Sequence, residues 1–569
     1  MCSAPILPSI ATRFAQYSLV LFLLTACSHT VVVKDQDLPE HLIVVNPAGG
    51  LVCPFGEGKG CEPNSSKRGP VTYDIGKSLA DTVQRIQAED NAVSTRPHNA
   101  ASNADTEESV SPITSTSTLP PCKRVEPLGD PSKDEIRTYT RCLLKRASEY
   151  ANESDTVKLL LYIHGGLNTY ADGIERAECQ YQSIMNDGYY PLFVVWNSDG
   201  PSSYYEYLAK TRNGTVSSSA KVTAPFYLLS DTLASVGNLF KAWIVTGKNF
   251  WDARIDRDKN LYDLTKFSEL DPSVPVYRAA SKNHSSTQKE LTWAVTTPIR
   301  IVTTPFAYTM PKSAWDIMLR RTKLLFTTES DFKQYEAHAY REASGVLTVL
   351  IDELRNFSIS LKPKQLEITI VGHSMGGIVA NQLVHDAPDL PFKRIIHMAS
   401  ADSIQNLMDK TVPYLIEKQR NSLSDTSPSV EYYGLMLDPE RESTELAGWG
   451  MLPSGSLLVW IDSMYTAPET LMSRTSGRWE NMNQVLRLFP SELLEKGYLR
   501  FKIFGQEEDQ DLPNKWPQSH GQFDDFAYWT EPFVWDDREV QNLRLRKDKL
   551  TGKCTYNSPT AQLECCAAR

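Results

Sequence analysis

The segment Gly372-His373-Ser374-Met375-Gly376-Gly377 places a serine between glycines, a spacing that suits nucleophilic chemistry. An apolar run of strand length, 367–371, leads directly into it, and a helix-compatible run, 378–387, follows. The glycines permit a crowded turn that lifts the serine side chain above a sheet, where a substrate can reach it. The helix N-terminus behind the turn supplies N–H groups for a developing oxyanion. We therefore predict that Ser374 is a nucleophile.

A serine hydroxyl is a poor nucleophile at neutral pH until a base takes its proton. After Ser374 the chain contains three histidines, His385, His397 and His520. His385 falls on the helix that follows the serine and His397 falls inside an apolar strand, so both are predicted to be structural. His520 lies in a polar loop after the last strand-like run, and we predict that it is the catalytic base.

An acidic side chain must orient that histidine and stabilise its cation. Asp438, which follows the apolar run 430–437, is one candidate for the acid. Asp402 is the alternative, and its structural role would be to cap the helix that begins at Ser403. Asp462 ranks third, because its segment also reads as a helix.

A second glycine motif, His164-Gly165-Gly166-Leu167-Asn168, ends the strand-like run 157–163. With the serine motif it resembles the α/β-hydrolase superfamily, in particular its lipase and esterase branch. The likeness extends from about Lys158 to His520. It implies a Ser…Asp…His order along the chain and an active site at the ends of parallel strands. It also favours Asp438 over Asp402 as the acid, because Asp438 is at the commoner position for the acid in this superfamily.

The same resemblance implies an oxyanion hole formed by the N–H groups of Met375 and Gly166, with Leu167 as a further candidate donor. It implies neither cofactor nor metal. The cysteines and histidines also show no zinc-site spacing. An acidic run at 507–511 lacks the glycine and the spacing of a calcium loop and is predicted to be a solvated loop.

These residues predict a serine carboxylic-ester hydrolase that works through an acyl-Ser374 intermediate, with an ester substrate that includes lipid esters among the candidates. One alternative is an acyltransferase that uses the same three side chains. Another is a non-catalytic cell-envelope interaction protein that retains the hydrolase fold, because a fold does not establish a function. The sequence gives neither the natural substrate nor its acyl-chain length, nor the oligomeric state.

The elements that must position these residues alternate between helical and strand-like segments. Near-continuous apolar strands separated by helices predict an α/β fold, with a mostly parallel sheet covered by helices on both faces. The strand-like runs are 157–163, 193–196, 367–371, 394–398, 430–437 and 499–504, and a helical pattern covers 134–150. We place the hydrolase domain at residues 131–545.

Within that domain the alternation of strand-like and helical segments is interrupted, and residues 198–330 are predicted to be an inserted helical cap. Leu229, Leu233, Val236, Phe240 and Trp243 recur at helical spacing and define one apolar face. A second apolar stretch, 291–311, is interrupted by an arginine and prolines. These faces either pack on the core or line a site for apolar substrate.

The N-terminus has the layout of an export signal, residues 1–26, with one arginine before a short apolar run. Leu24-Thr25-Ala26-Cys27 resembles a bacterial lipobox, which implies that Cys27 carries lipid and anchors the protein in a membrane. By the same resemblance to bacterial lipoproteins, Ser28, a residue other than aspartate after the cysteine, implies the outer membrane. Residues 27–130 form an N-terminal extension with a Ser/Thr/Pro-rich tether.

Composition bounds the remaining possibilities. The 569 residues include 41% hydrophobic residues and carry a formal net charge of −10, so the chain can bury a large core and would repel nucleic acid. Ten cysteines in an exported chain allow disulfides. Cys53 and Cys61 are the first pair to try, and residues 546–569 form a cysteine-containing tail.

Overall fold

The fold is described from a computed structural model. The structure describes residues 30–33, 35, 37–47, 49–52, 71–74, 133–152, 154–212, 215–217, 219–237, 276–278, 310–328, 345–421, 429–445, 455–466, 468–504, 516–530, 545–547 and 553–555. Several predicted features lie outside these ranges, namely the signal and Cys27, the tether, Cys53 and Cys61, Phe240 and Trp243, residues 291–309, the acidic run 507–511 and most of the tail.

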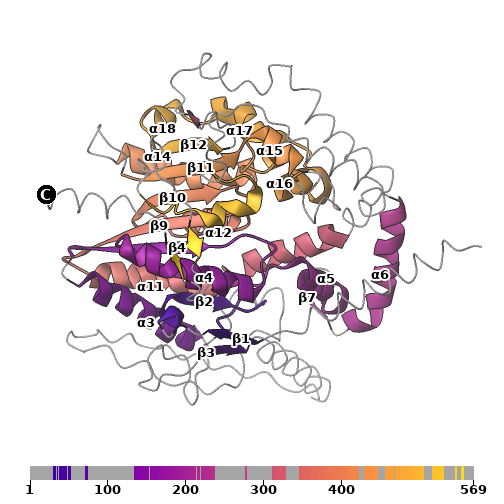
Figure 1. Cartoon of the computed structure of the whole chain (residues 1–569), viewed down its shortest axis with the longest axis horizontal. Coiled ribbons are helices and arrows are strands. Elements are labelled where there is room, and N and C mark those ends of the chain that lie inside the picture. The colour runs from indigo at the N-terminus through magenta and orange to yellow at the C-terminus, as the bar shows by residue number, and fades with distance from the viewer. Residues whose placement is uncertain are drawn as a thin grey trace, which may run out of the picture.

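A parallel sheet forms the centre of the molecule (Figure 1). Seven strands lie in the order β2-β5-β4-β9-β10-β11-β12, and the short strand β8 (Val276–Arg278) extends the β12 edge. All neighbouring pairs run parallel, which confirms the predicted α/β class. The seven strands are β2 (Leu42–Val45), β4 (Thr156–Ile163), β5 (Tyr190–Trp196), β9 (Gln365–His373), β10 (Phe392–Met398), β11 (Glu431–Leu437) and β12 (Leu499–Phe504).

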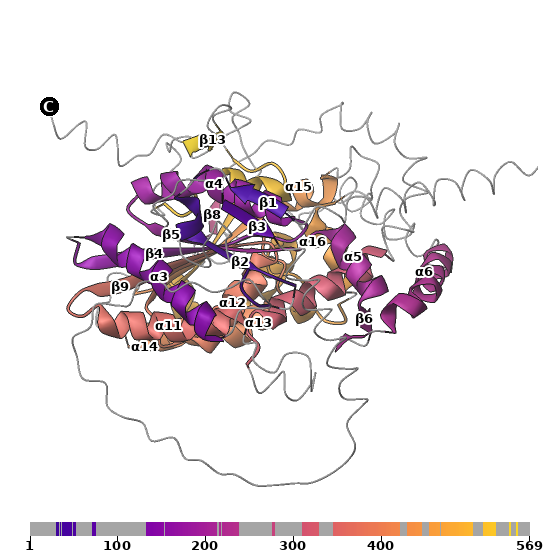
Figure 2. The same cartoon turned by 90° about the horizontal axis from the view of Figure 1, so that it is seen from below.

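Helices cover both faces of this sheet (Figure 2). One face carries α4 (Tyr170–Asn186). The other carries α3 (Lys133–Ala151), α11 (Val346–Ser360), α12 (Gly376–Asp386) and α14 (Val412–Arg420). Burial on both faces explains why the strands are apolar at almost every position, as in β5, where all seven residues are buried.

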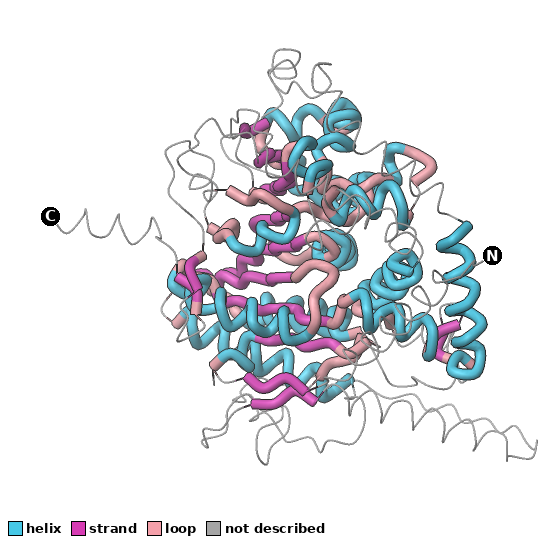
Figure 3. The backbone as a smooth tube through the Cα atoms, turned by 45° about the vertical axis from the view of Figure 1, so that its right-hand side comes forward, coloured by secondary structure: helices cyan, strands magenta, loops and turns pink. Residues whose placement is uncertain are grey.

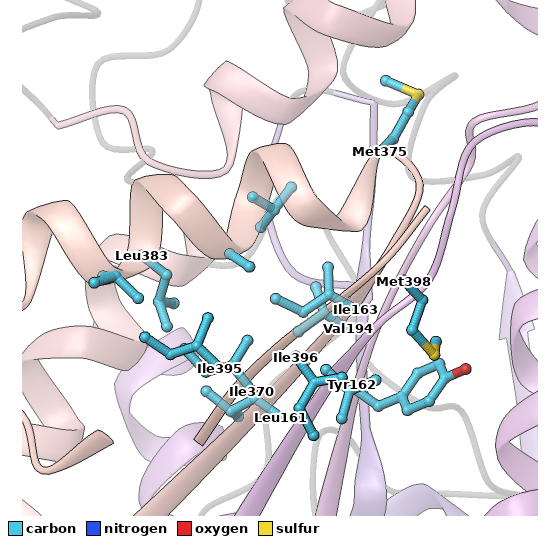
Figure 4. Close-up of a cluster of buried hydrophobic side chains, with 14 of the residues drawn as sticks. Leu161, Tyr162, Ile163, Val194, Ile370, Met375, Leu383, Ile395, Ile396 and Met398 are labelled. Carbon is cyan, nitrogen blue, oxygen red and sulfur yellow. The ribbon is translucent and has the colours of Figure 1, made fainter. Parts of the chain in front are cut away.

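The core beside α12 shows how this layering fixes the centre of the sheet. Leu383 of α12 points toward Ile370 of β9 and Ile395 of β10 (Figure 4). Tyr162 and Met398 point away from α12, toward the other face. Since β9 lies between β4 and β10, the loops that follow these three strands meet at one edge of the sheet.

The predicted insertion contains α5 (Gly200–Ala209) and α6 (Ala220–Gly237), joined through the short antiparallel strands β6 (Thr211–Arg212) and β7 (Thr215–Val216). A further helix covers residues 310–324. Helix α6 lies at the edge of the molecule, beyond α5 and away from the sheet (Figures 1 and 3).

The orientation of α6 differs from what its periodicity alone suggests. Leu229 and Leu233 are 58% and 63% exposed, so this part of the apolar stripe does not pack on the core. Asp231 and Ser235 are buried instead, and Tyr204 of α5 donates a hydrogen bond to Asp231. The side of the helix that faces the protein is therefore mixed, because Leu228 packs on the core beside these polar residues.

A disulfide joins Cys179 of α4 to Cys554 of β14 (Cys554–Thr555), which pairs with β13 (Arg546–Lys547). Among the described helices, none is long and apolar enough to cross a bilayer. The remaining described elements are β1 (Thr30–Val33), η1 (Leu38–His41), β3 (Val71–Asp74), α13 (Ile404–Asn406), η3 (Leu407–Thr411), α15 (Pro439–Thr444), α16 (Leu457–Trp460), η5 (Ile461–Tyr465), η6 (Leu471–Ser473), α17 (Trp479–Val485), η7 (Leu486–Leu488), α18 (Ser491–Glu495) and η8 (His520–Asp525).

Candidate active site

Ser374 occupies a tight turn between the end of β9 and the start of α12. Its φ angle is 52°, in the left-handed region that a serine adopts only where the surroundings enforce it. Its N–H donates to the carbonyl of Met398 at 2.8 Å, and its own carbonyl accepts from Gly377 and Ala401 at 3.1 and 2.9 Å. These backbone bonds hold the turn from the end of β10, from the loop that follows β10 and from α12.

Gly372, two residues before Ser374, must be glycine because the backbone of α12 passes close to it. A Cβ atom on Gly372 would lie 2.7 Å from the carbonyl oxygen of Gly376. Any side chain at 372 would therefore force the strand and the helix apart. The serine motif thus has a steric requirement for glycine, which is independent of any chemistry at Ser374.

His520 meets Ser374 across the turn. The distance from His520 Nε2 to Ser374 Oγ is 3.0 Å, and both side chains are buried. Burial and the neighbouring His373 lower the pKa of His520 to about 3, while Asp524 acts in the opposite direction. His520 is therefore neutral near pH 7, the state that a base requires.

The second glycine motif lies against the first. A Cβ atom on Gly166 would lie 2.6 Å from Met375 Sδ, so a larger residue at 166 would require the Met375 side chain to move. No hydrogen bond among the described residues uses the N–H of Gly166 or of Met375. The N–H of Leu167 donates to the carbonyl of Ser198 at 2.9 Å, so this candidate donor is already occupied.

The predicted acids are placed differently from one another. The carboxylate of Asp402 accepts hydrogen bonds from the side chains of Asn381 and Asn406 and from the N–H of Ser403. The capping role considered above for Asp402 is wrong, because Ser403 is the N-cap of α13 and its hydroxyl accepts from the N–H of Asn406. Asp462 accepts from Thr475, Arg478 and Asn481. Both carboxylates are thus engaged in holding local structure, and none of their hydrogen bonds to described residues involves His520.

Asp438 lies at the end of β11, where its N–H donates to the carbonyl of Phe504 at 2.7 Å. Among the residues that the structure describes, none forms a hydrogen bond with His520 Nδ1, so no described carboxylate is bonded to this nitrogen. The carboxylate that does contact this histidine is Glu445, whose Oε2 accepts from the backbone N–H of His520 at 2.9 Å. Glu445 belongs to no sequence motif, so only its position after β11 could have indicated that it contacts His520.

Asp524 is a second carboxylate that the sequence did not single out. It lies in the same short helix as His520, η8, and is buried. Tyr162 donates to its Oδ1 at 2.7 Å, and Arg176 lies 2.9 Å from its Oδ2. Burial raises the pKa of Asp524, but Arg176, His373 and Tyr162 outweigh burial and hold this pKa well below its usual range.

Within the described residues, no group of three or more His, Cys, Asp or Glu side chains is arranged to hold a metal ion. The chain matches no family model, no curated protein and no solved structure. The geometry of the site and its motifs are therefore what bears on the function of this chain.

Proposed function

We propose that this chain is a serine hydrolase that cleaves a carboxylic ester through an acyl-Ser374 intermediate. The observation that carries the proposal is the 3.0 Å distance between His520 Nε2 and Ser374 Oγ. Ser374 lies in a left-handed turn at the end of a central parallel strand. The loop beside it carries the N–H of Gly166, which donates no hydrogen bond to any described residue. The Ser374…His520 chain order supports the resemblance to the α/β-hydrolase superfamily.

The chemistry follows from this geometry. Ser374 Oγ attacks the ester carbonyl while its proton moves to His520 Nε2. The N–H groups of Met375 and Gly166 receive the oxyanion, an interaction worth about 3 kcal/mol per donor. Collapse breaks the bond to the alcohol, which leaves with the proton from His520. Water then attacks the acyl-Ser374 carbonyl while its proton moves to His520, and collapse releases the acid and returns the proton to Ser374 Oγ.

For the acid we propose Asp438, which follows the strand that precedes the histidine strand. Hydrogen bonds of catalytic groups are often long before substrate binds, so the unbonded Nδ1 of His520 does not argue against this role. Glu445 is the competing candidate, because it contacts His520 directly.

Labelling with a serine-directed fluorophosphonate tests the proposal, combined with hydrolysis of p-nitrophenyl esters of different chain lengths by the full chain. We expect labelling at Ser374, and we expect Ser374→Ala and His520→Ala to lose about 10⁴-fold or more in kcat while remaining folded. Labelling at another serine would refute the assignment. An acyltransferase would instead produce a new ester when an acceptor alcohol competes with water.

We further propose that Cys27 carries the lipid that anchors this hydrolase in the bacterial cell envelope, at the outer membrane. The basis is the lipobox-like segment that ends at Cys27. A palmitate analogue fed to cells should label the wild type and miss Cys27→Ser. Equal labelling of the two would place the anchor elsewhere.

A further inference from the structure

A chain of polar contacts connects two segments of the site. One is η8 (His520–Asp525), here called the histidine turn, and the other is the loop after β4, residues 164–168, here called the glycine loop. The centre of this chain of contacts is Arg176, which projects from α4 with a side chain that is 19% exposed. Nη2 of Arg176 lies 2.9 Å from Oδ2 of Asp524 and 3.4 Å from Oδ1 of Asn168. One guanidinium nitrogen thus contacts a residue of η8 and a residue of the loop after β4.

Each of these partners holds a part of the site. Nδ2 of Asn168 donates to the carbonyls of Gly165 and Gly166 at 2.9 and 3.0 Å, which fixes the loop whose Gly166 N–H is proposed to bind the oxyanion. Asp524 follows His520 in the same short helix, and its carbonyl accepts from Gln180 of α4 at 2.7 Å. The histidine turn is therefore fastened to α4 at two points.

His373 closes the network from the serine side. Its Nε2 donates to the carbonyl of His520 at 3.1 Å, because a carbonyl can only accept. Its Nδ1 lies 2.9 Å from Oδ2 of Asp524, although not in the direction of a hydrogen bond. The residue next to the nucleophile thus touches both ends of the histidine turn.

From these contacts we infer that Arg176 is a positioning residue that holds the base His520 and the oxyanion donor Gly166 in register with each other. The inference rests on the proposed hydrolase function. The ion pair between Arg176 and Asp524 positions His520, which lies in the same short helix as Asp524. The contact between Arg176 and Asn168 positions the loop after β4. Both groups act on the same transition state, so an error in either position slows the chemical step without weakening ester binding.

The test compares Arg176→Met with Arg141→Met. Arg141 makes a similar pair with a buried carboxylate, Glu353, at 2.6 Å, but between α3 and α11 and away from the site. Both variants should lower the melting temperature, because each removes an arginine that bonds to a buried carboxylate. The loss should be smaller in Arg141→Met, because Glu353 keeps a 3.8 Å contact with Arg137. Only Arg176→Met should lose about 100-fold in kcat at nearly unchanged KM, and Arg176→Lys should restore part of that loss.

A second pair serves if Arg176→Met does not fold. Tyr162→Phe removes the hydrogen bond to Asp524, and Tyr139→Phe removes equally buried bonds to the carbonyls of Pro39 and Leu42. We expect about a tenfold loss of kcat in the first and none in the second. If Tyr162→Phe matches Tyr139→Phe, or Arg176→Met matches Arg141→Met, in kcat as well as in stability, the inference is wrong.

Hydrogen exchange separates this inference from the proposed function. In Arg176→Met, exchange should rise together in residues 164–169 and 516–530, and in Arg141→Met it should rise in neither. That result would support the coupling even if the wild type neither hydrolysed esters nor reacted with fluorophosphonate, an outcome that would refute the hydrolase proposal alone. Unchanged exchange in either segment would overturn the coupling.

Discussion

At Ser374 and His520 the structure pairs a buried hydroxyl with a buried imidazole, and this burial has a consequence for pH dependence. The pKa of His520 is lowered to about 3, so its neutral form persists well below the usual histidine range. We expect kcat/KM to remain level from pH 7 down to pH 5, measured with an ester whose spontaneous hydrolysis is slow. An acidic limb centred near 6.5, the ordinary histidine value, would contradict this expectation, because kcat/KM reports the pKa values of the free enzyme.

The identity of the acid is also decided at this scale. Glu445 contacts the backbone N–H of His520, and a glutamine amide oxygen can accept the same bond. We therefore expect Glu445→Gln to keep most of kcat and Asp438→Asn to lose far more, with Asp402→Asn close to the wild type in kcat. The three variants should be compared by kcat at pH 7. A reversed order between Glu445→Gln and Asp438→Asn would transfer the role to Glu445.

The elements of the sheet could be predicted from the sequence because their apolar runs are long and buried on both faces. The strand predicted at 499–504 coincides with β12. In contrast, β5 begins at Tyr190, three residues before the predicted start at 193. The prediction began too late because Pro191 interrupts the residue pattern that is typical of a strand. The roles of Asp524 and Arg176 could not be predicted in this way. Asp524 contacts Tyr162 across 362 residues, and no local spacing records such a contact.

Helix α6 shows a different limit, since periodicity defines a stripe but not the direction in which it faces. Leu229 and Leu233 are exposed, so Leu229→Ser and Leu233→Ser should leave the melting temperature nearly unchanged. Leu143→Ser in α3, where the side chain is fully buried, should lower it strongly and serves as the control. A large loss of stability in the α6 variants would mean that this face is covered.

The same α6 variants test the proposed cap. If the stripe contacts the acyl chain of the substrate, the KM for long-chain esters should rise more than the KM for acetate esters. Each buried methylene is worth about 0.8 kcal/mol, so a few lost contacts should produce a clear dependence on chain length. An unchanged preference in a stable double variant would remove α6 from the substrate site.

For the whole molecule, the buried histidines set the response to acid. Burial lowers the pKa of His41 and His164 to about 4 and that of His397 to about 3, as it does for His520. Below about pH 6.5 the unfolded chain binds protons that the folded chain excludes, so the free energy of unfolding falls as the pH falls. We expect urea midpoints to decrease from pH 7 to pH 5, and less steeply in His41→Gln. A parallel decrease in that variant would exclude His41 as a contributor.

The disulfide between Cys179 and Cys554 joins positions 375 residues apart, and both Ser374 and His520 lie within the stretch that it encloses. A single protease cut anywhere inside that stretch would therefore leave the two pieces covalently attached. Such a nicked molecule would migrate as one species on a non-reducing gel and as two after reduction. The nucleophile and the base would stay tethered to each other through α4, so the protein could tolerate damage to its backbone that would release half of the site from an unlinked chain.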